Sequence, residues 1–227
     1  MSGPRIGILG GSYDPVHFGH LFVAEAARAE AGLDRILFLP VASPAHRKTH
    51  APPADRRAMV ELATTDNRHF FIDSTALDQP APAYTADTLH LLRGAYPSAE
   101  FYFIAGTDSL VRSRWRFLDR VAVALVCFYL VPRRGSSFED VAPVIGDLPA
   151  HLQARFKPLP LPFLDISSTQ IRARTAAGQP IRYLTPDPVV KYIESRGLYR
   201  PTAITENDDA SKQRAAPSGS VRFKNGE

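Results

Sequence analysis

The sequence has a single cysteine, little net charge and no long hydrophobic run. Because Cys127 stands alone among 227 residues, no disulfide can form within the chain, and nothing marks an oxidising compartment. The most apolar run is residues 121–131, and a membrane helix needs about 20 residues, so this run is too short to cross a membrane. Residues 1–11 are too few for a secretory signal and lack its long apolar core. We therefore expect a cytoplasmic protein with no membrane partner.

The net charge and the length of the chain further limit the class of protein that we expect. A formal net charge of +4 suits an anionic ligand, but it is too small, and its cations too dispersed, to indicate a nucleic-acid-binding protein. Hydrophobic residues make up 44% of the chain, as in an ordinary globular core. We expect one domain over residues 1–200 and a disordered polar tail over residues 201–227, because that stretch is polar and aperiodic. Nothing in the pattern indicates an oligomeric state.

Short apolar runs alternate with segments of helical periodicity. Strands separated by helices predict βαβ units, so we expect an α/β fold with a Rossmann-like, doubly wound parallel sheet and helices on both faces. Ligands bind such sheets beyond the carboxyl ends of the strands, where the strand order reverses. The expected strands are residues 5–9, 35–40, 70–73, 100–105 and 121–131, and the expected helices are residues 20–31, 55–65, 85–96, 168–177 and 188–196.

The stretch after the first expected strand is the most informative. Gly10 and Gly11 allow a tight turn and a close approach of the backbone to a ligand, with Ser12 next in the turn. The chain then enters a helix near His20, and the start of a helix favours phosphate binding. His17 and His20 are three positions apart, so they share one face if the first turn is helical, and both imidazoles can donate to a triphosphate.

A metal site is the weaker interpretation of these histidines. It would recruit His46 and His50, but no cysteine or carboxylate completes a recognised ligand spacing. We therefore expect no metal ligands among the side chains.

A second motif lies near the end of the expected domain, at residues 166–172. Ser167 or Ser168 can cap the helix that follows, and their hydroxyls suit phosphate oxygens. Arg172 adds a permanent charge and a fork of donors. Taken alone, the segment is more simply a capped helix with an exposed arginine. Its occurrence together with the first motif favours a phosphate site.

The two motifs resemble the His-x-Gly-His and Ile-Ser-Ser-Thr-x-Ile-Arg signatures of the nucleotidyltransferase superfamily. The resemblance implies that His17, His20 and Arg172 are the catalytic residues, which hold the phosphates of ATP and stabilise the transition state. It also implies a Mg²⁺ ion bound mainly through ATP. The residues expected to bind ATP are Gly10, Gly11, Ser12, Gly106, Asp108, Ile166, Ser167, Ser168 and Thr169.

Further segments over about residues 5–200 are similar to the nicotinate-nucleotide adenylyltransferases. They are Pro44-Ala-His46-Arg47-Lys48, Tyr84-Thr85-Ala-Asp-Thr-Leu, Ile104-Ala-Gly106-Thr-Asp108-Ser-Leu, Trp115, and the closing segment from Pro186 to Tyr199. Ala45, Ala83 and Arg134 depart from the family pattern. The resemblance implies an enzyme that transfers AMP from ATP to nicotinate mononucleotide in NAD biosynthesis, giving nicotinate adenine dinucleotide and pyrophosphate.

The acceptor site is expected from the same segments. Trp115 offers a stacking plane for the pyridine ring, the backbone near Tyr84 and Thr85 offers donors for the ring carboxylate, and His46, Arg47 and Lys48 offer positive charge for the phosphate. Each residue also has a plainer interpretation, with Trp115 as a core aromatic, Asp108 as a helix cap, and the Arg-Lys pair as a solvated loop.

Two other functions stay open at this point. The acceptor can be nicotinamide mononucleotide or another substrate of the superfamily. The chain can also be a catalytically silent nucleotide-binding module, although the intact motif residues His17, His20 and Arg172 argue against that.

Overall fold

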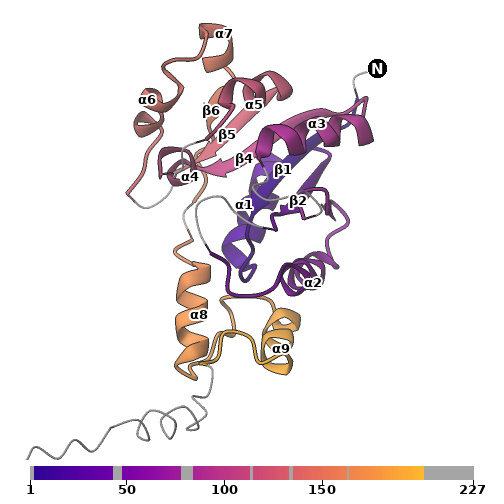
Figure 1. Cartoon of the computed structure of the whole chain (residues 1–227), viewed down its shortest axis with the longest axis vertical. Coiled ribbons are helices and arrows are strands. Elements are labelled where there is room, and N and C mark those ends of the chain that lie inside the picture. Colours follow the sequence, from indigo (N-terminus) through magenta and orange to yellow (C-terminus); the bar gives the residue numbers. More distant parts are fainter. Residues whose placement is uncertain are drawn as a thin grey trace, which may run out of the picture.

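The computed structural model describes residues 3–42, 48–77, 84–112, 115–132, 135–162 and 164–201, and within them it forms a parallel β-sheet covered by helices (Figure 1). The strand order is β3-β2-β1-β4-β5-β6, and every pair of neighbours is parallel. The expected Rossmann-like, doubly wound fold is confirmed. The strands are β1 (Arg5–Gly11), β2 (Arg35–Pro40), β3 (Phe70–Ile72), β4 (Glu100–Gly106), β5 (Cys127–Val131) and β6 (Phe156–Pro158).

Helices pack on both faces of the sheet, and each face has its own apolar cluster. On one face, Val23 of α1 (Phe18–Glu30), Met59 of α2 (Pro53–Thr64) and Ile171 of α8 (Ser168–Ala176) share a buried cluster that also takes in α9 (Asp187–Ser195). On the other face, Leu89 of α3 (Thr85–Ala95) and Val121 of α5 (Leu118–Ala124) belong to a second cluster. That face also carries α4 (Thr107–Arg112), η1 (Glu139–Val141), α6 (Ala142–Ile145) and α7 (Ala150–Gln153).

The strand order reverses beside β1. This strand pairs with β2 on one side and with β4 on the other, so the chain winds outward in both directions from the β1–β4 pair. The carboxyl ends of these two strands are Gly11 and Gly106, and α1 and α4 begin just beyond them. This switch point is where an open α/β sheet binds its ligands.

One expected strand is wrong in part. Residues 121–131 form the end of helix α5 and, after a short break, strand β5. Leu118, Val121 and Ala122 are buried on one side of the helix, whereas Val123 is 60% exposed. An unbroken apolar run hides this change of period, because it satisfies a strand and a helix pattern equally well. The other expected elements are confirmed with small shifts of their ends.

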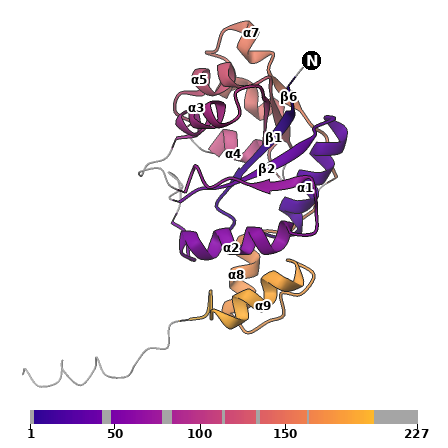
Figure 2. The same ribbon diagram turned by 90° about the vertical axis from the view of Figure 1, so that its right-hand side faces the viewer.

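The last two helices dock beneath α2 (Figure 2). The hydroxyl of Tyr192 in α9 donates to the buried Asp55 carboxylate of α2 at 2.8 Å, and Nε of Arg196 donates to the same oxygen at 3.2 Å. The C-terminal helices are thereby held on the α1–α2 face. Apart from residue 201, the tail expected over residues 201–227 lies outside the described residues, and the domain boundary near residue 200 stays a prediction. No helix in the described ranges has the length and hydropathy to cross a membrane.

Candidate active site

The β1–α1 turn (residues 12–17) leads into the two motif histidines. His17 caps α1, and its backbone N–H donates to Nδ1 of His20 at 3.2 Å. The two rings stack, with centroids 3.7 Å apart and planes 29° apart. Because Nδ1 of His20 accepts this hydrogen bond, the neutral ring carries its proton on Nε2. The His-x-x-His spacing therefore produces one paired unit.

The packing around the pair fixes both rings. The Tyr13 ring meets the His20 ring edge-on, with centroids 5.0 Å apart, and the Tyr13 hydroxyl donates to the Leu9 carbonyl. Burial raises the pKa of Tyr13 well above its ordinary value, so this hydroxyl stays protonated. A Cβ at Gly19 would lie 3.0 Å from the His17 ring and 3.5 Å from the Ile166 carbonyl oxygen. Glycine at this position lets both approach the start of α1.

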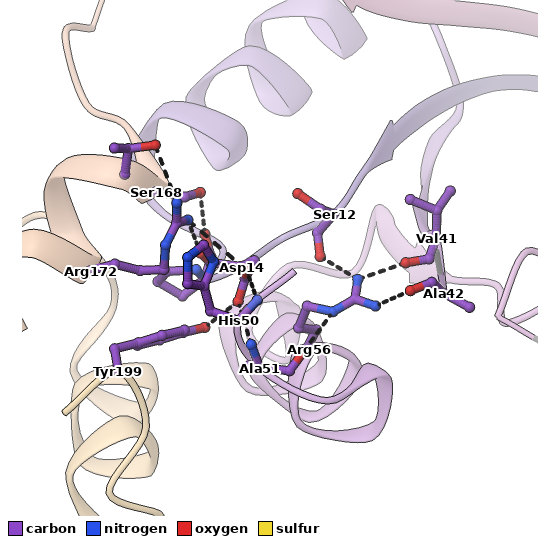
Figure 3. A network of polar contacts seen from close by, with 12 residues as sticks. Ser12, Asp14, Val41, Ala42, His50, Ala51, Arg56, Ser168, Arg172 and Tyr199 are labelled. Atoms are coloured by element: carbon purple, nitrogen blue, oxygen red, sulfur yellow. Dashed lines mark hydrogen bonds and ion pairs between the residues drawn. The ribbon is translucent and has the colours of Figure 1, made fainter. Parts of the chain in front are cut away.

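The second motif docks directly on the first (Figure 3). Ser167 caps α8 by accepting from the backbone N–H of Gln170 at 3.2 Å. The Ser168 hydroxyl donates to the Pro15 carbonyl at 2.8 Å, and Nη1 of Arg172 donates to the Asp14 carbonyl at 2.7 Å. Segments 158 positions apart are thus brought into contact. The expectation that the two motifs meet in the fold is confirmed, and their joint binding of a phosphate stays a prediction.

Arg172 is more enclosed than a capping helix alone predicts. Its side chain is 19% exposed, and Nη2 donates to the Thr169 hydroxyl at 3.3 Å. At the start of α1, the Phe18 N–H donates to the Leu184 carbonyl at 3.1 Å. One of the N–H groups expected to serve a phosphate is therefore used inside the protein.

Asp14 is the centre of the contacts that hold the turn. Its side chain is 3% exposed, and Oδ2 accepts from the backbone N–H of His50 at 2.7 Å and lies 3.2 Å from the ring Nδ1. Oδ1 accepts from the Ala51 N–H at 3.0 Å and from the Tyr199 hydroxyl at 2.9 Å. Burial on its own raises the pKa of Asp14, but these donors outweigh it, and the pKa lies below its ordinary value. The carboxylate is therefore ionised at neutral pH.

Arg56, in α2, is the other buried charge beside the turn (Figure 3). Its guanidinium donates to the carbonyls of Ser12 and Val41 at 2.6 Å each, of Ala42 at 2.8 Å and of Ala51 at 3.2 Å. Burial lowers the pKa of Arg56, and the nearby negative charge of Asp14 opposes that shift. One side chain thus joins the end of β2, the start of α2 and the β1–α1 turn.

The β4 end of the site carries Gly106 and Asp108. Gly106 is the last residue of β4, and Asp108 lies half-buried in the first turn of α4. The neighbouring Thr107 hydroxyl donates to the Ser136 carbonyl at 2.9 Å, which ties the start of α4 to the following loop. Since β1 and β4 are adjacent and parallel, the helix that carries Asp108 begins at the same sheet edge as the β1–α1 turn.

Trp115 packs on the core in this structure. Its Nε1 donates to the Ser109 carbonyl at 3.1 Å, and its ring meets Phe103 and Phe128 edge-on at 5.7 and 5.5 Å. The indole is half-buried, so the plainer interpretation as a core aromatic describes its contacts. Stacking against a ligand stays a prediction for this residue.

Tyr84 and Thr85 lie at the start of α3. The guanidinium of Arg116 sits over the Tyr84 ring, 5.5 Å from its centroid, and donates to the Tyr84 hydroxyl at 3.2 Å. Thr85 is the first residue of the helix. Because α3 follows β3, it begins at the carboxyl edge of the sheet, on the same side as the two motifs.

The remaining expected acceptor residues lie in the connection between β2 and α2. His46 and Arg47 are outside the described residues, and Lys48 is exposed. In the described part of the chain, no three His, Cys, Asp or Glu side chains gather as a possible metal site. His50, which the metal interpretation would recruit, contacts Asp14 instead.

Asp14, Arg56 and Tyr199 have roles that the sequence reasoning missed. Arg56 carried one usable signal, since it falls on the same helical face as the buried Met59 and Val60 and is therefore expected inside. The partners of Arg56 are main-chain carbonyls, which every residue type supplies, so no pattern in the sequence points to them.

The chain is similar to known proteins over most of its length. A family model described as cytidylyltransferase-like matches residues 8–174. A probable nicotinate-nucleotide adenylyltransferase of Roseiflexus sp. (strain RS-1) is 43% identical over 203 residues, which cover 88% of this chain and 100% of that relative. One of Corynebacterium kroppenstedtii is 41% identical over 88% of this chain and 92% of its own length.

A solved structure supports the fold. Plasmodium falciparum nicotinic acid mononucleotide adenylyltransferase complexed with NaAD matches with a TM-score of 0.70 at 18% identity, and the match covers 86% of this chain and 97% of that one.

Proposed function

This chain belongs to the nicotinate-nucleotide adenylyltransferases, and we propose that its β1–α1 turn and the start of α8 together bind the triphosphate of ATP. The enzyme transfers AMP from ATP to nicotinate mononucleotide, giving nicotinate adenine dinucleotide and pyrophosphate in NAD biosynthesis. The observation that carries the proposed site is the docking of Ser168 and Arg172 on the carbonyls of Pro15 and Asp14.

The chemistry needs charge stabilisation more than a base. The phosphate of the acceptor is already an anion at neutral pH, so it attacks the α-phosphorus of ATP directly and pyrophosphate leaves. Catalysis then rests on positioning and on donors aimed at the phosphate oxygens. We assign this task to His17, to Nε2 of His20 and to Arg172, the first two held as a stacked pair and the third held against Asp14.

The residues that surround the triphosphate site suit a metal carried by the substrate. Asp14 is the buried carboxylate of the turn, and both of its oxygens accept hydrogen bonds from the protein. A Mg²⁺ ion would therefore be held mainly by phosphate oxygens and water, as this ion is when it is bound with a nucleotide. When bound, it neutralises charge on those oxygens.

The other proposed contacts divide between the two substrates. Gly10, Gly11, Ser12, Gly106 and Asp108 line the carboxyl ends of β1 and β4, where we place the nucleotide. The acceptor contacts are proposed for His46, Arg47, Lys48, Tyr84, Thr85 and Trp115. Their support is the position of Tyr84, Thr85 and Lys48 after strands that end at one edge of the sheet. We also propose that the enzyme works in the cytoplasm, in keeping with its single cysteine.

A substrate panel tests the function. The full chain is mixed with ATP, Mg²⁺ and either nicotinate mononucleotide, nicotinamide mononucleotide or phosphopantetheine, and pyrophosphate release is followed. We expect the fastest release with nicotinate mononucleotide. Faster release with the amide would contradict the acid as substrate. Binding of ATP without pyrophosphate from any acceptor would instead indicate a silent nucleotide-binding module.

A further inference from the structure

Arg56 is a fully buried cation whose hydrogen bonds, over the described residues, all go to the main chain. It is 0% exposed, and the four carbonyls that it contacts come from three separate segments. Burying a guanidinium is costly unless its donors are satisfied. The neighbouring Arg57 is half-exposed and pairs with Glu61 one helical turn away, as an ordinary surface arginine does. The contrast indicates that Arg56 is held inside for its contacts.

These contacts join the segments proposed to hold the two substrates. Ser12 belongs to the β1–α1 turn, on the ATP side. Val41 and Ala42 immediately precede the segment that contains His46, Arg47 and Lys48, on the acceptor side. A single guanidinium therefore sets the distance between the start of the acceptor segment and the turn.

The two sides depend on Arg56 to different degrees. The turn is also held by the Asp14 carboxylate, which accepts hydrogen bonds from three residues. In addition, the Ser168 hydroxyl donates to the Pro15 carbonyl, and the Thr185 hydroxyl donates to the Val16 carbonyl at 2.8 Å. Over the described residues, the other contacts of residues 41 and 42 are fewer: the Val41 N–H donates to the Gly11 carbonyl at 3.1 Å, the Ala42 N–H donates to the Ala76 carbonyl at 3.5 Å, and the Val41 side chain packs on the core. Loss of Arg56 therefore releases the acceptor side more than the ATP side.

We propose that Arg56 is a positioning residue that fixes the start of the acceptor-binding segment against the ATP-binding turn. It touches neither substrate and acts through the carbonyls of Ser12, Val41 and Ala42. The proposal rests on the proposed function, because it needs an acceptor bound by the segment that follows Ala42.

Replacement of Arg56 by lysine tests the proposal. Lysine keeps the charge but presents its donors from one point, so it cannot reach carbonyls from three segments as the planar guanidinium does. In steady-state assays of the full-length enzyme, we expect Arg56→Lys to raise the KM for nicotinate mononucleotide about tenfold, the scale of losing one charged hydrogen bond. The KM for ATP should change by less than about twofold, since the other contacts of the turn remain.

Arg57→Lys is the matched control, and it should leave both KM values unchanged. A purely structural role for Arg56 makes a different prediction. Partial unfolding lowers the number of active molecules and hence the apparent kcat, while the molecules that stay folded keep both KM values. Thermal unfolding of each variant gives the folded fraction, and Arg56→Gln serves as a second variant if the lysine variant does not fold.

Three results would overturn the proposal. They are equal changes in the two KM values, unchanged KM values with a lower apparent kcat, and failure of both Arg56 variants to fold. Each can be told apart from failure of the proposed function, because in that case the wild-type enzyme itself releases no pyrophosphate with nicotinate mononucleotide.

Discussion

The proposed ATP side and the proposed acceptor side of this site are built in different ways. The β1–α1 turn is fixed by side chains from α2, α8 and the C-terminal segment, and its central carboxylate, Asp14, accepts hydrogen bonds from three residues. On the proposed acceptor side, Lys48 is exposed, and the carbonyls of Val41 and Ala42 both accept from the guanidinium of Arg56. The difference indicates that several elements fix the turn proposed for the reacting phosphates, whereas residues 41 and 42, at the proposed acceptor side, share the guanidinium of Arg56.

The largest effect should follow the loss of a donor from the rigid side. His20→Ala removes Nε2, so we expect kcat to fall at least about a hundredfold, the scale of one transition-state donor. Fold stability should change little, because the side chain is only partly buried. Steady-state assays and thermal unfolding measure both quantities, and His90→Ala on the exposed face of α3 is the control. Near-normal turnover would remove His20 from the catalytic machinery.

Removal of the charge at the centre of the turn should have the next largest effect. Asp14→Asn places amide N–H donors opposite the donors of His50, Ala51 or Tyr199, so we expect a loss of about 2 kcal/mol in the free energy of unfolding at pH 7. Urea unfolding measures it. Asp87→Asn, in a half-exposed pair with Arg120, should change stability by less than about 0.5 kcal/mol.

This difference in stability should also depend on pH. The pKa of Asp14 is lowered by folding, so the folded state binds the proton less tightly than the unfolded chain. The stabilisation is therefore fully present above the ordinary pKa of 3.8 and is lost as the pH falls through the lower pKa of the folded state. The gap between wild type and Asp14→Asn should shrink below about pH 4. A gap that is the same at pH 3 and pH 7 would contradict this account of the turn.

A smaller effect is expected from crowding the histidine pair. Gly19→Ala places a Cβ 3.0 Å from the His17 ring, so the ring must shift, and we expect kcat to fall about tenfold. Alanine favours the helix, so the midpoint of thermal unfolding should stay the same or rise. Gly94→Ala in α3 meets no atom within 4 Å and should stabilise the protein at unchanged activity. Equal activities for the two variants would show that the spacing of the pair is not critical.

The sequence predicted the local structure of the two motifs and their contact. The glycines after β1, the paired His17 and His20, and the capped helix with Arg172 were all readable, because helix starts and strand ends have local signals. The contact between the two motifs followed from their joint occurrence and is confirmed.

The parts of the site that depend on tertiary contacts could not be predicted from the sequence. Arg56 donates to main-chain carbonyls, and Asp14 accepts from the N–H groups of His50 and Ala51, so the partners carry no signal of residue type. For Trp115 the sequence allows two interpretations, because a single tryptophan suits an apolar core and a stacking site for a ligand equally well. The break between α5 and β5 was hidden by apolar residues on both sides of it.

A crystal structure of the enzyme with a non-hydrolysable ATP analogue would show whether the two motifs bind one triphosphate. We expect Nε2 of His20 and the guanidinium of Arg172 both to lie within hydrogen-bond distance of the phosphate oxygens of one analogue molecule, about 2.7–3.2 Å. A triphosphate bound elsewhere, or one that touches only one of these two residues, would contradict this expectation.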